Sequence, residues 1–437
     1  MAMRHPGKSF DAGGICPRRP GLLARGGLAG HMDMNTLDAY LERLMADTEA
    51  AGLRRSLRDV TARHGVSITA DGRALTNFSS NDYLGLANHP ALIEAARRAA
   101  TDWGSGTGAA RLVCGSLRVF RDLEESLAGW KGCAAALSFS TGYAAALGTV
   151  PALVGPGDVV AIDKRVHACC VDAARLSGAT LRVFRHNDLN DLERILLWAR
   201  KPSGDAARTV RILVISESVF SMDGDEAPLR ELVELKDRHG AWLMVDEAHA
   251  AGLYGTRRTG LAEAAGVSDR IDIHMGTLGK ALGSSGGYIA GSAALRDHLI
   301  NHARSFVFST APVPAAPAAA LAAVRLIQTS EGERRVARLH SHLHTLRGAL
   351  PLTADARAAS SAILPILAGA ETRAIEWSTA LREAGFLVPA IRYPTVARGS
   401  ARLRVTVSAD HDGSDVQALI AAVQSLPPLS PSNPVSE

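Results

Sequence analysis

Residues 242–290 read WLMVDEAHAAGLYGTRRTGLAEAAGVSDRIDIHMGTLGKALGSSGGYIA. This stretch contains three short apolar runs, at 242–245, 271–275 and 287–290, separated by amphipathic and glycine-rich segments. Short apolar runs that alternate with longer amphipathic stretches are typical of a parallel sheet whose strands are buried under covering helices. The same alternation extends back to residue 130 and predicts further strands at 134–139, 159–162, 180–184 and 211–215. The pattern therefore predicts an α/β fold with a mostly parallel sheet.

The segments on either side of this sheet predict a second, smaller α+β domain. Residues 318–350 have the pattern of one long helix, and they are followed by expected strands within 362–369 and 401–408 and by a final helix near 415–426. A chain of 437 residues is long enough for more than one core. We expect these parts: a disordered extension (1–33), an N-terminal helix and arm (34–80), a large cofactor-binding domain (81–320), a C-terminal α+β domain (321–426) and a loose tail (427–437).

The composition excludes several classes of protein. Hydrophobic residues make up 47% and charged residues 21% of the chain, which is ordinary for a soluble globular protein, and no apolar run approaches the ~20 residues of a membrane-spanning helix. A net charge of +4 from scattered arginines does not indicate nucleic-acid binding. Five cysteines without CxxC spacing, two of them the neighbours Cys169 and Cys170, favour a reducing cytoplasm.

Polar side chains follow four of the expected strands at the point where each strand ends. These residues are Asp163 and His167, Glu217 and Ser221, Asp246 and His249, and Thr277 and Lys280. Ligands of open parallel sheets gather at the carboxyl ends of the strands, so these side chains are expected to converge on one crevice.

Asp246 and Lys280 indicate the chemistry of this crevice. Asp246 follows the buried run WLMV, where a carboxylate needs a cationic partner such as a protonated pyridine nitrogen. Lys280 lies in the small-residue loop GTLGKALGSSGG, where partial desolvation lowers the pKa of the amine and suits it to imine chemistry. Together they predict pyridoxal 5′-phosphate (PLP), which accepts the carbanion formed at an amino acid Cα. Taken singly, Asp246 is also compatible with a helix cap and Lys280 with a surface charge.

The segment LSFSTGYAAALG predicts a strand, a tight turn and the start of a helix. The amides of Gly142 and Tyr143 would then point at an anion that the helix dipole also attracts, as in a phosphate site. Ser221 and Thr277 are candidates for further hydroxyl contacts to this phosphate, or alternatively for caps of local turns.

Three other motifs do not support a different function. DEAH at 246–249 matches a helicase string, but the chain contains no GxxxxGK[ST] phosphate loop. GSGTG at 104–108 follows a helical stretch rather than a strand, so it is not a dinucleotide turn. His340 and His344 are four residues apart on an expected helix with His342 between them, and an exposed helix face explains them better than a metal site. We therefore expect no metal.

From about residue 53 to 411 the chain resembles the α-oxoamine synthases, a family of fold-type I PLP enzymes that join an amino acid to an acyl thioester with loss of carbon dioxide. The matching strings, in order, are NFSSNDYLGLANHP, STGYAAALG, VHACCVDAARLSGATLRVFRHNDL, SESVFSMDGDEAPL, MVDEAHAAGLYG, GTLGKALGSSGGYIAG and ARLRVTVS. An ordered set over most of the chain is far more specific than any single motif.

The resemblance implies a role for each matching residue. Lys280 would be the Schiff-base lysine and Asp246 the partner of the pyridine nitrogen, while His167 would stack on the ring and His249 would bond its phenolate oxygen. The cofactor or its phosphate would also be served by Gly142, Tyr143, Ser221 and Thr277. Polar active-site positions of the family are matched by Asn81 and Glu217.

On the substrate side, the resemblance implies that Arg404 in ARLR clamps the amino acid carboxylate. Arg392, Thr395 and Arg55 would lie nearer the acyl substrate, and Arg54 fits nearly as well as Arg55. The family also implies a homodimer in which Asn81 and Thr277 reach across or lie near the subunit interface.

Members of the family differ in their substrates. The segments FSSNDYLGL and GYAAALG are most similar to the branch that joins L-alanine to a pimeloyl thioester, carried by CoA or a carrier protein, in biotin biosynthesis. RLVCGS at 111–116 and GTLGKALG are similar instead to the branch that joins glycine to acetyl-CoA. Two further alternatives are an aminotransferase on the same fold and a catalytically silent partner subunit, although such subunits lack the lysine that this chain keeps.

Overall fold

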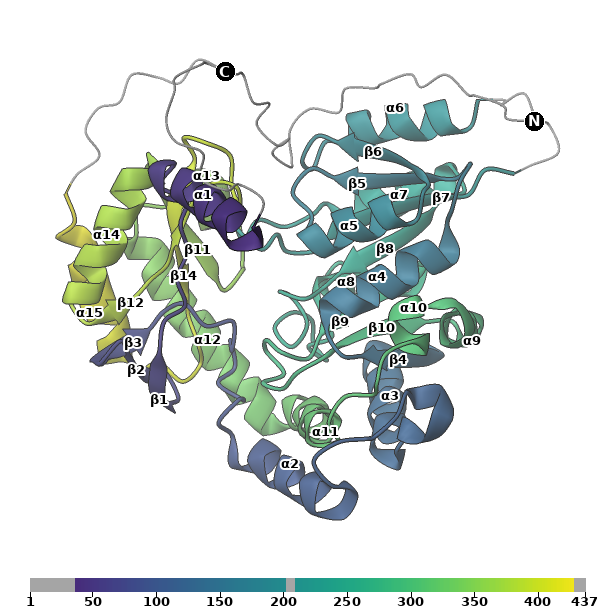
Figure 1. The fold of residues 1–437 in the computed structure, drawn as a ribbon, viewed down its shortest axis with the longest axis horizontal. Coiled ribbons are helices and arrows are strands. Elements are labelled where there is room, and N and C mark those ends of the chain that lie inside the picture. The colour runs from purple at the N-terminus through teal and green to yellow at the C-terminus, as the bar shows by residue number, and fades with distance from the viewer. Residues whose placement is uncertain (1–35, 202–208, 428–437) are drawn as a thin grey trace.

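The structure is a computed structural model that describes residues 36–201 and 209–427. The expected extension at 1–33 and all but the first residue of the expected tail at 427–437 lie outside the described residues. Figure 1 shows two lobes, a larger one on the right around the main sheet and a smaller one on the left. No described helix combines the length and the apolar character needed to cross a membrane.

The main sheet contains all seven strands that the sequence predicts. In sheet order they are β4 (Ala135–Phe139), β10 (Gly287–Gly291), β9 (Ile273–Thr277), β8 (Trp242–Asp246), β7 (Ile212–Glu217), β5 (Val159–Asp163) and β6 (Thr180–Phe184). The pairs from β9 to β6 are parallel, whereas β10 runs antiparallel to both β4 and β9. The apolar pattern cannot distinguish these directions, because a strand buried on both faces reads the same in either.

Helices cover both faces of this sheet, and the chain links them to the strands by short loops (Figure 1). They are α3 (Arg118–Lys131), α4 (Gly142–Leu153), α5 (Ala168–Leu176), α6 (Leu189–Ala199), α7 (Leu229–Arg238), α8 (Leu261–Ala264), α9 (Ala293–His302) and α10 (Arg304–Val307). A π-helix (Arg111–Gly115) precedes α3, and a 3₁₀ turn (Ser268–Arg270) precedes β9. The apolar faces of α4–α10 pack with the strands in one core, whereas α3 and one face of β4 and β10 join a second core that is shared with the smaller lobe. Packing on both faces holds the carboxyl ends of the strands in place.

The smaller lobe combines both ends of the chain. One sheet has the order β11 (Ile363–Gly369), β14 (Ala401–Thr406), β13 (Ala390–Ile391), and the other joins β1 (Val60–His64), β2 (Ser67–Ala70) and β3 (Arg73–Asn77) to β12 (Phe386–Leu387). Helices α13 (Ala354–Ala358), α14 (Glu371–Glu383) and α15 (Gly413–Gln424) complete the lobe. The pairing of β3 with β12 fixes the segment after β3, which includes Asn81, beside the C-terminal strands.

The prediction of a single helix at 318–350 is wrong. The chain forms two helices there, α11 (Ala315–Ile327) and α12 (Ser330–Ala349), with a bend between them. Thr329 is extended and caps α12 by accepting a hydrogen bond from the Glu331 amide. The bend brings Gly332 against the Ile327 carbonyl, and a Cβ at Gly332 would lie 2.2 Å from that oxygen. Helix α11 packs on α2 (Pro90–Trp103) under the larger lobe, and α12 runs diagonally from there to the smaller lobe (Figure 1).

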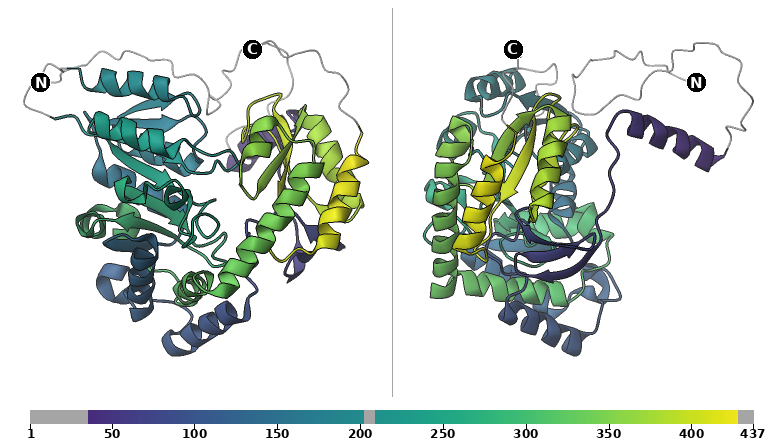
Figure 2. Two further views of the ribbon diagram at one scale, coloured as in Figure 1. Left: turned by 180° about the vertical axis from the view of Figure 1, so that it is seen from behind. Right: turned by 90° about the vertical axis from the view of Figure 1, so that its left-hand side faces the viewer.

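The expected N-terminal helix is α1 (Leu37–Ala50), which ends where Gly52 adopts a positive φ of 65° two residues after it. Figure 2 shows α1 standing away from the body of the molecule, and none of its side chains is buried.

The histidines of α12 have different environments. His344 is exposed, whereas His342 is buried and bonds the His411 carbonyl at 2.9 Å. His342 therefore has a structural role, contrary to the expected exposed face.

Candidate active site

The ends of β7, β8 and β9 converge as the sequence predicts, whereas Asp163 at the end of β5 binds His186 instead of joining them. Glu217, Asp246 and Thr277 are the last residues of β7, β8 and β9, so each lies inside its strand rather than beyond it. Glu217 and Asp246 are direct register partners on adjacent strands. Two carboxyl groups therefore stand side by side at the carboxyl edge of the sheet.

Burial decides the charges of these two groups. Asp246 is 4% exposed, and its carboxylate accepts a hydrogen bond from the Ala248 amide at 2.9 Å. Burial raises the pKa of Asp246, while the charge of Lys280 opposes that rise. Burial, followed by repulsion from Asp246, raises the pKa of Glu217 to about 8. We infer that Glu217 is protonated at neutral pH and that Asp246 is the anion of the pair.

Lys280 is linked to the opposite wall by a chain of hydrogen bonds. Its Nζ lies 2.6 Å from Nε2 of His249, and Nδ1 of His249 lies 2.6 Å from the Tyr83 hydroxyl. That hydroxyl donates to Oδ1 of Asn81 at 3.1 Å. Tyr83 was not predicted from the sequence; its place two residues after Asn81 was the only available signal.

The direction of this chain follows from the state of His249. Burial lowers the pKa of His249 well below its usual value, and the neighbouring charge of Lys280 acts in the same direction, so the ring is neutral with one N–H. Because Tyr83 donates to Asn81, Nδ1–H of His249 donates to the Tyr83 oxygen and Nε2 accepts from the Lys280 amine. Burial also lowers the pKa of Lys280, which increases the fraction of neutral amine. His249 thus orients a lysine amine whose neutral fraction is increased.

Arg404 brings a buried positive charge from the smaller lobe. It lies on β14 and is 5% exposed. Its Nε donates to the Ser221 carbonyl at 2.7 Å and its Nη1 donates to Oδ1 of Asn81 at 3.2 Å. These contacts join Arg404 to the same network as Lys280.

The start of α4 leaves backbone amides free to bind an anion. Thr141 caps the helix through its hydroxyl, and the first helical hydrogen bond runs from the Ala145 amide to the Thr141 carbonyl, so the amides of Gly142 and Tyr143 precede the bonded turns. A Cβ at Gly287 would lie 2.5 Å from the Gly142 nitrogen, so glycine at 287 allows β10 to approach this helix end. The Tyr143 hydroxyl points elsewhere and donates to Asp172.

Ser221 and Thr277 have local partners. The buried Ser221 donates its amide to Glu217 Oε2 at 3.1 Å. The Thr277 hydroxyl donates to the Gly286 carbonyl at 3.0 Å and accepts from the Gly279 amide at 3.2 Å, so it closes the loop that carries Lys280. His167 caps α5, with Nδ1 accepting from the Cys169 amide at 3.2 Å. A separate interaction with the Cys169 side chain raises the pKa of His167, although burial opposes it. Their contacts with a cofactor remain predictions.

The residues expected near the acyl substrate form a separate exposed cluster. Arg55 donates to the Thr395 hydroxyl at 3.4 Å, and Arg392 donates to the Gly52 carbonyl at 2.8 Å. Arg54 instead pairs with Glu49 at 2.6 Å. Of the two arginines that fit the pattern, Arg55 is therefore the one that joins this cluster.

The arrangement fits PLP in three respects. Among the described residues, the buried Oε1 of Glu217 has no hydrogen-bond partner, and Asp246 has no direct cationic contact. A pyridinium would supply the missing cation for Asp246. The half-buried amine of Lys280 and the helix end at Gly142 match the aldehyde and phosphate groups of the same molecule.

A histidine beyond this network holds the turn that follows β7. His186 Nδ1 lies 2.9 Å from Asp163 Oδ1, and Nε2 lies 2.5 Å from Asp225 Oδ2. Burial disfavours the charged ring, but hydrogen bonds and charges from Asp163 and Asp225 outweigh it and raise the pKa of His186 to about 9. The same turn also contacts the smaller lobe, because Asp223 pairs with Arg402.

We expect His186 to make stability depend on pH in the alkaline range. Its pKa is raised on folding, so its stabilising contribution is complete below pH ~6.5 and is lost as the pH rises through about 9. Urea unfolding at pH 6.5, 8 and 9.5 should show that the gap between wild type and His186→Gln narrows as the pH rises. The exposed His64→Gln is the control. A gap that stays constant with pH would contradict the prediction.

Comparisons with known proteins agree with this geometry. The family described as aminotransferase class I and II matches residues 73–423. An 8-amino-7-oxononanoate synthase of Anaeromyxobacter sp. (strain K) is 48% identical over 418 residues, covering 94% of this chain and 99% of the relative. One from Geobacter sulfurreducens is 46% identical over 373 residues, covering 85% and 94%.

The structural comparison points to the same group of enzymes. A serine palmitoyltransferase variant from S. paucimobilis, solved with a bound PLP and myriocin adduct, superposes with a TM-score of 0.83 at 28% identity and covers 90% of this chain and 98% of that one. The chain therefore belongs to the aminotransferase class I and II family and, within it, to the α-oxoamine synthases, PLP enzymes of fold type I.

Proposed function

We propose that the chain is an acyltransferase that condenses L-alanine with a pimeloyl thioester to give 8-amino-7-oxononanoate, carbon dioxide and the free thiol, a step of biotin biosynthesis. The observation that carries the proposal is the meeting of Lys280, Asp246 and Arg404 in one hydrogen-bonded and electrostatic network. Identities of 46 to 48% to relatives named for this activity support the choice of substrates.

PLP, when bound, withdraws the electron pair that forms at the amino acid Cα. The protein residues do the rest. Arg404, held by Ser221 and Asn81, binds the carboxylate of alanine. Lys280, with its lowered pKa and its bond to His249, removes the proton from Cα and later returns one to the product. Asp246 stays ionised to hold the ring nitrogen in its protonated form.

Burial of this network has a second effect. His249, Glu217 and Arg404 are buried, so few water molecules reach the position of Cα. Exclusion of water limits premature protonation of the carbanion before the thioester carbonyl arrives. The exposed cluster of Arg55, Arg392 and Thr395 is the proposed contact for the carrier end of the acyl substrate.

The substrates are tested by a panel assay. Purified protein loaded with PLP is given L-alanine, glycine or L-serine against pimeloyl-CoA, acetyl-CoA and palmitoyl-CoA, with thiol release and product mass as readouts. We expect L-alanine with pimeloyl-CoA to turn over fastest and to give one thiol for each 8-amino-7-oxononanoate. Turnover of glycine with acetyl-CoA alone would assign the chain to the alternative branch. Formation of pyruvate from alanine without thiol release would make it an aminotransferase.

We also infer that the enzyme works as a homodimer in the cytoplasm. The unburied helix α1 exposes Leu37, Leu41 and Leu44, and the π-helix exposes Leu112 and Val113. Apolar patches of this kind are typical of protein interfaces. Light scattering that finds an active monomer would contradict the dimer.

The proposed location in the cytoplasm is supported by the cysteines. Those in the described part of the chain are all free, which suits a reducing compartment.

A further inference from the structure

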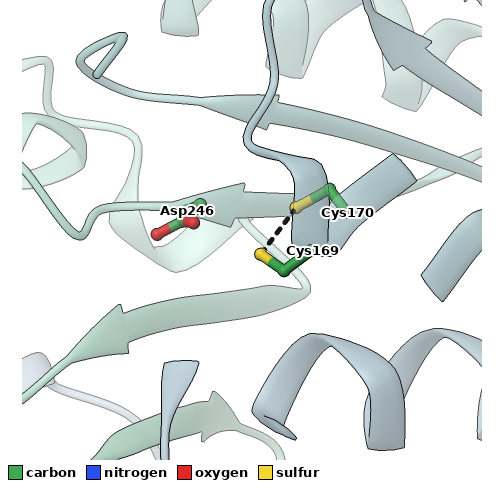
Figure 3. Close-up of side chains that lie close together, drawn as sticks. All are labelled: Cys169, Cys170 and Asp246. Atoms are coloured by element: carbon green, nitrogen blue, oxygen red, sulfur yellow. Dashed lines mark hydrogen bonds between the residues drawn. The ribbon is translucent and has the colours of Figure 1, made fainter. Parts of the chain in front are cut away.

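The neighbouring cysteines Cys169 and Cys170 lie inside the proposed cofactor site. Both belong to the first turn of α5, are 2% and 0% exposed, and have sulfur atoms 4.0 Å apart. Figure 3 shows the two sulfur atoms facing each other beside the carboxylate of Asp246 at the end of β8. The two sulfurs and a carboxylate oxygen of Asp246 all lie within 4.8 Å of one another. The proposed reaction uses neither thiol.

The spacing of the two sulfurs is close to that in a tetrahedral metal centre. Zinc–sulfur bonds of about 2.3 Å at tetrahedral angles separate two sulfurs by roughly 3.8 Å, so the observed pair needs to move by only a few tenths of an ångström. Two thiolates and one carboxylate are ligands that suit Zn²⁺ and softer divalent cations. The dipole at the N-terminal end of α5 favours negative charge on the Cys169 sulfur. The contact with Cys169 and burial instead raise the pKa of Cys170, so a bound cation must displace the proton of that thiol.

Asp246 has no direct cationic partner among the described residues. Its register partner Glu217 is protonated at neutral pH, and the Lys280 amine is directed to His249, so the charges of Lys280 and His167 act on Asp246 only at longer range. Among the described residues, the only hydrogen bond to the Asp246 carboxylate comes from the Ala248 amide. A buried carboxylate in this position is stabilised by any cation that reaches it, whether pyridinium or metal.

We propose that the cofactor-free chain binds one thiophilic divalent cation through Cys169, Cys170 and Asp246, and that this cation and PLP exclude each other because both require Asp246. The proposal rests on the assignment of Asp246 to the cofactor. It makes the cysteine pair a site that controls cofactor loading. A bound cation keeps the chain in its cofactor-free form until the cation is removed.

The test uses cadmium, whose bonds to thiolates give an ultraviolet charge-transfer band. Protein freed of PLP is titrated with Cd²⁺, and we expect one Cd²⁺ per chain with the intensity of two thiolate ligands. The PLP-loaded protein should show no band at the same cation concentration. Preloaded Cd²⁺ should block the return of the visible cofactor absorbance when PLP is added, and a chelator should restore it.

Variants separate this site from the other thiols. Cys169→Ser and Asp246→Asn should each weaken Cd²⁺ binding by at least about tenfold. The matched control Cys114→Ser removes an exposed thiol and should leave the titration unchanged. Circular dichroism checks that each variant is folded. Cys169→Ser is preferred to a change at the fully buried Cys170 because serine is nearly isosteric with cysteine.

Three results would overturn the proposal. They are a band that survives in Cys169→Ser, Cd²⁺ affinity that is unchanged in Asp246→Asn, and equal binding by the PLP-loaded and PLP-free protein. The readouts are metal binding and cofactor absorbance, so they do not depend on which acyl thioester is the substrate. Failure of the condensation assay therefore does not affect the cation test. Failure of the cation test likewise does not affect the proposed condensation.

Discussion

Replacement of Lys280 by alanine is expected to lower turnover by at least about 10²-fold to 10⁴-fold, the usual contribution of a positioned acid–base group. The chain of hydrogen bonds from Asn81 through Tyr83 and His249 ends on the Lys280 amine, and the described contacts around it provide no second lysine. Product mass and thiol release under saturating substrates measure the effect. The visible absorbance of bound PLP should also change, because the amine no longer reaches the cofactor.

Two controls make this result specific. Lys201→Ala removes an exposed lysine at the end of α6 and should leave turnover unchanged. Added methylamine should restore part of the activity of Lys280→Ala, because a small amine can occupy the space of the missing group. If the alanine variant keeps wild-type turnover, Lys280 is not the base and the proposed chemistry is wrong.

Replacement of Lys131 by methionine is expected to cost about 3–5 kcal/mol of unfolding free energy, the usual cost of breaking a buried ion pair by removing one partner. Lys131 at the end of α3 donates to Glu247 and to the Thr259 carbonyl, and both charged side chains are buried. Burial alone would raise the pKa of Glu247, but Lys131 and His274 lower it to about 2. Without Lys131, the Glu247 carboxylate loses its ammonium partner and keeps the Ala262 amide and the more distant His274 at 3.6 Å.

The loss of unfolding free energy in Lys131→Met should depend on pH and on whether Glu247 is still present. In the wild type, the depressed pKa of Glu247 contributes stability above pH ~4.5 that is lost as the pH falls toward about 2. The variant lacks this contribution, so its deficit should be largest above pH ~4.5 and should shrink as the pH falls from about 4.5 toward about 3. Adding Glu247→Gln to Lys131→Met should restore most of the stability, because it removes the uncompensated charge.

Urea unfolding at constant protein concentration measures these differences. The control is Arg118→Met, which breaks the exposed pair between Arg118 and Asp122 and should cost about 0.5 kcal/mol or less. Equal losses in Lys131→Met and Arg118→Met would contradict the prediction.

The ion pair matters for the site because Glu247 stands between Asp246 and the loop that carries His249. Its carboxylate accepts from the Ala262 amide at 3.0 Å, and its own amide donates to Met275 on β9 at 2.9 Å. Gly260 passes so close that a Cβ there would lie 2.3 Å from the carboxylate. Lys131 and Glu247 therefore hold the end of β8 in place from behind the active site.

The sequence by itself determined the strands of the main sheet and the polar residues at their ends. Strands buried on both faces need unbroken apolar runs, and parallel strands necessarily bring their carboxyl ends to one edge, so Glu217, Asp246 and Lys280 could be placed together without coordinates. Their roles toward the cofactor and substrates remain predictions.

Only the tertiary structure decided which side chains meet. Tyr83 reaches His249 across 166 positions, and Arg404 reaches Asn81 across 323. The direction of β10, the bend between α11 and α12 and the meeting of Cys169 with Asp246 likewise depend on packing. Hydrophobic periodicity records how a residue faces its own element, whereas these contacts depend on how separate elements pack against each other, and no local pattern contains that information.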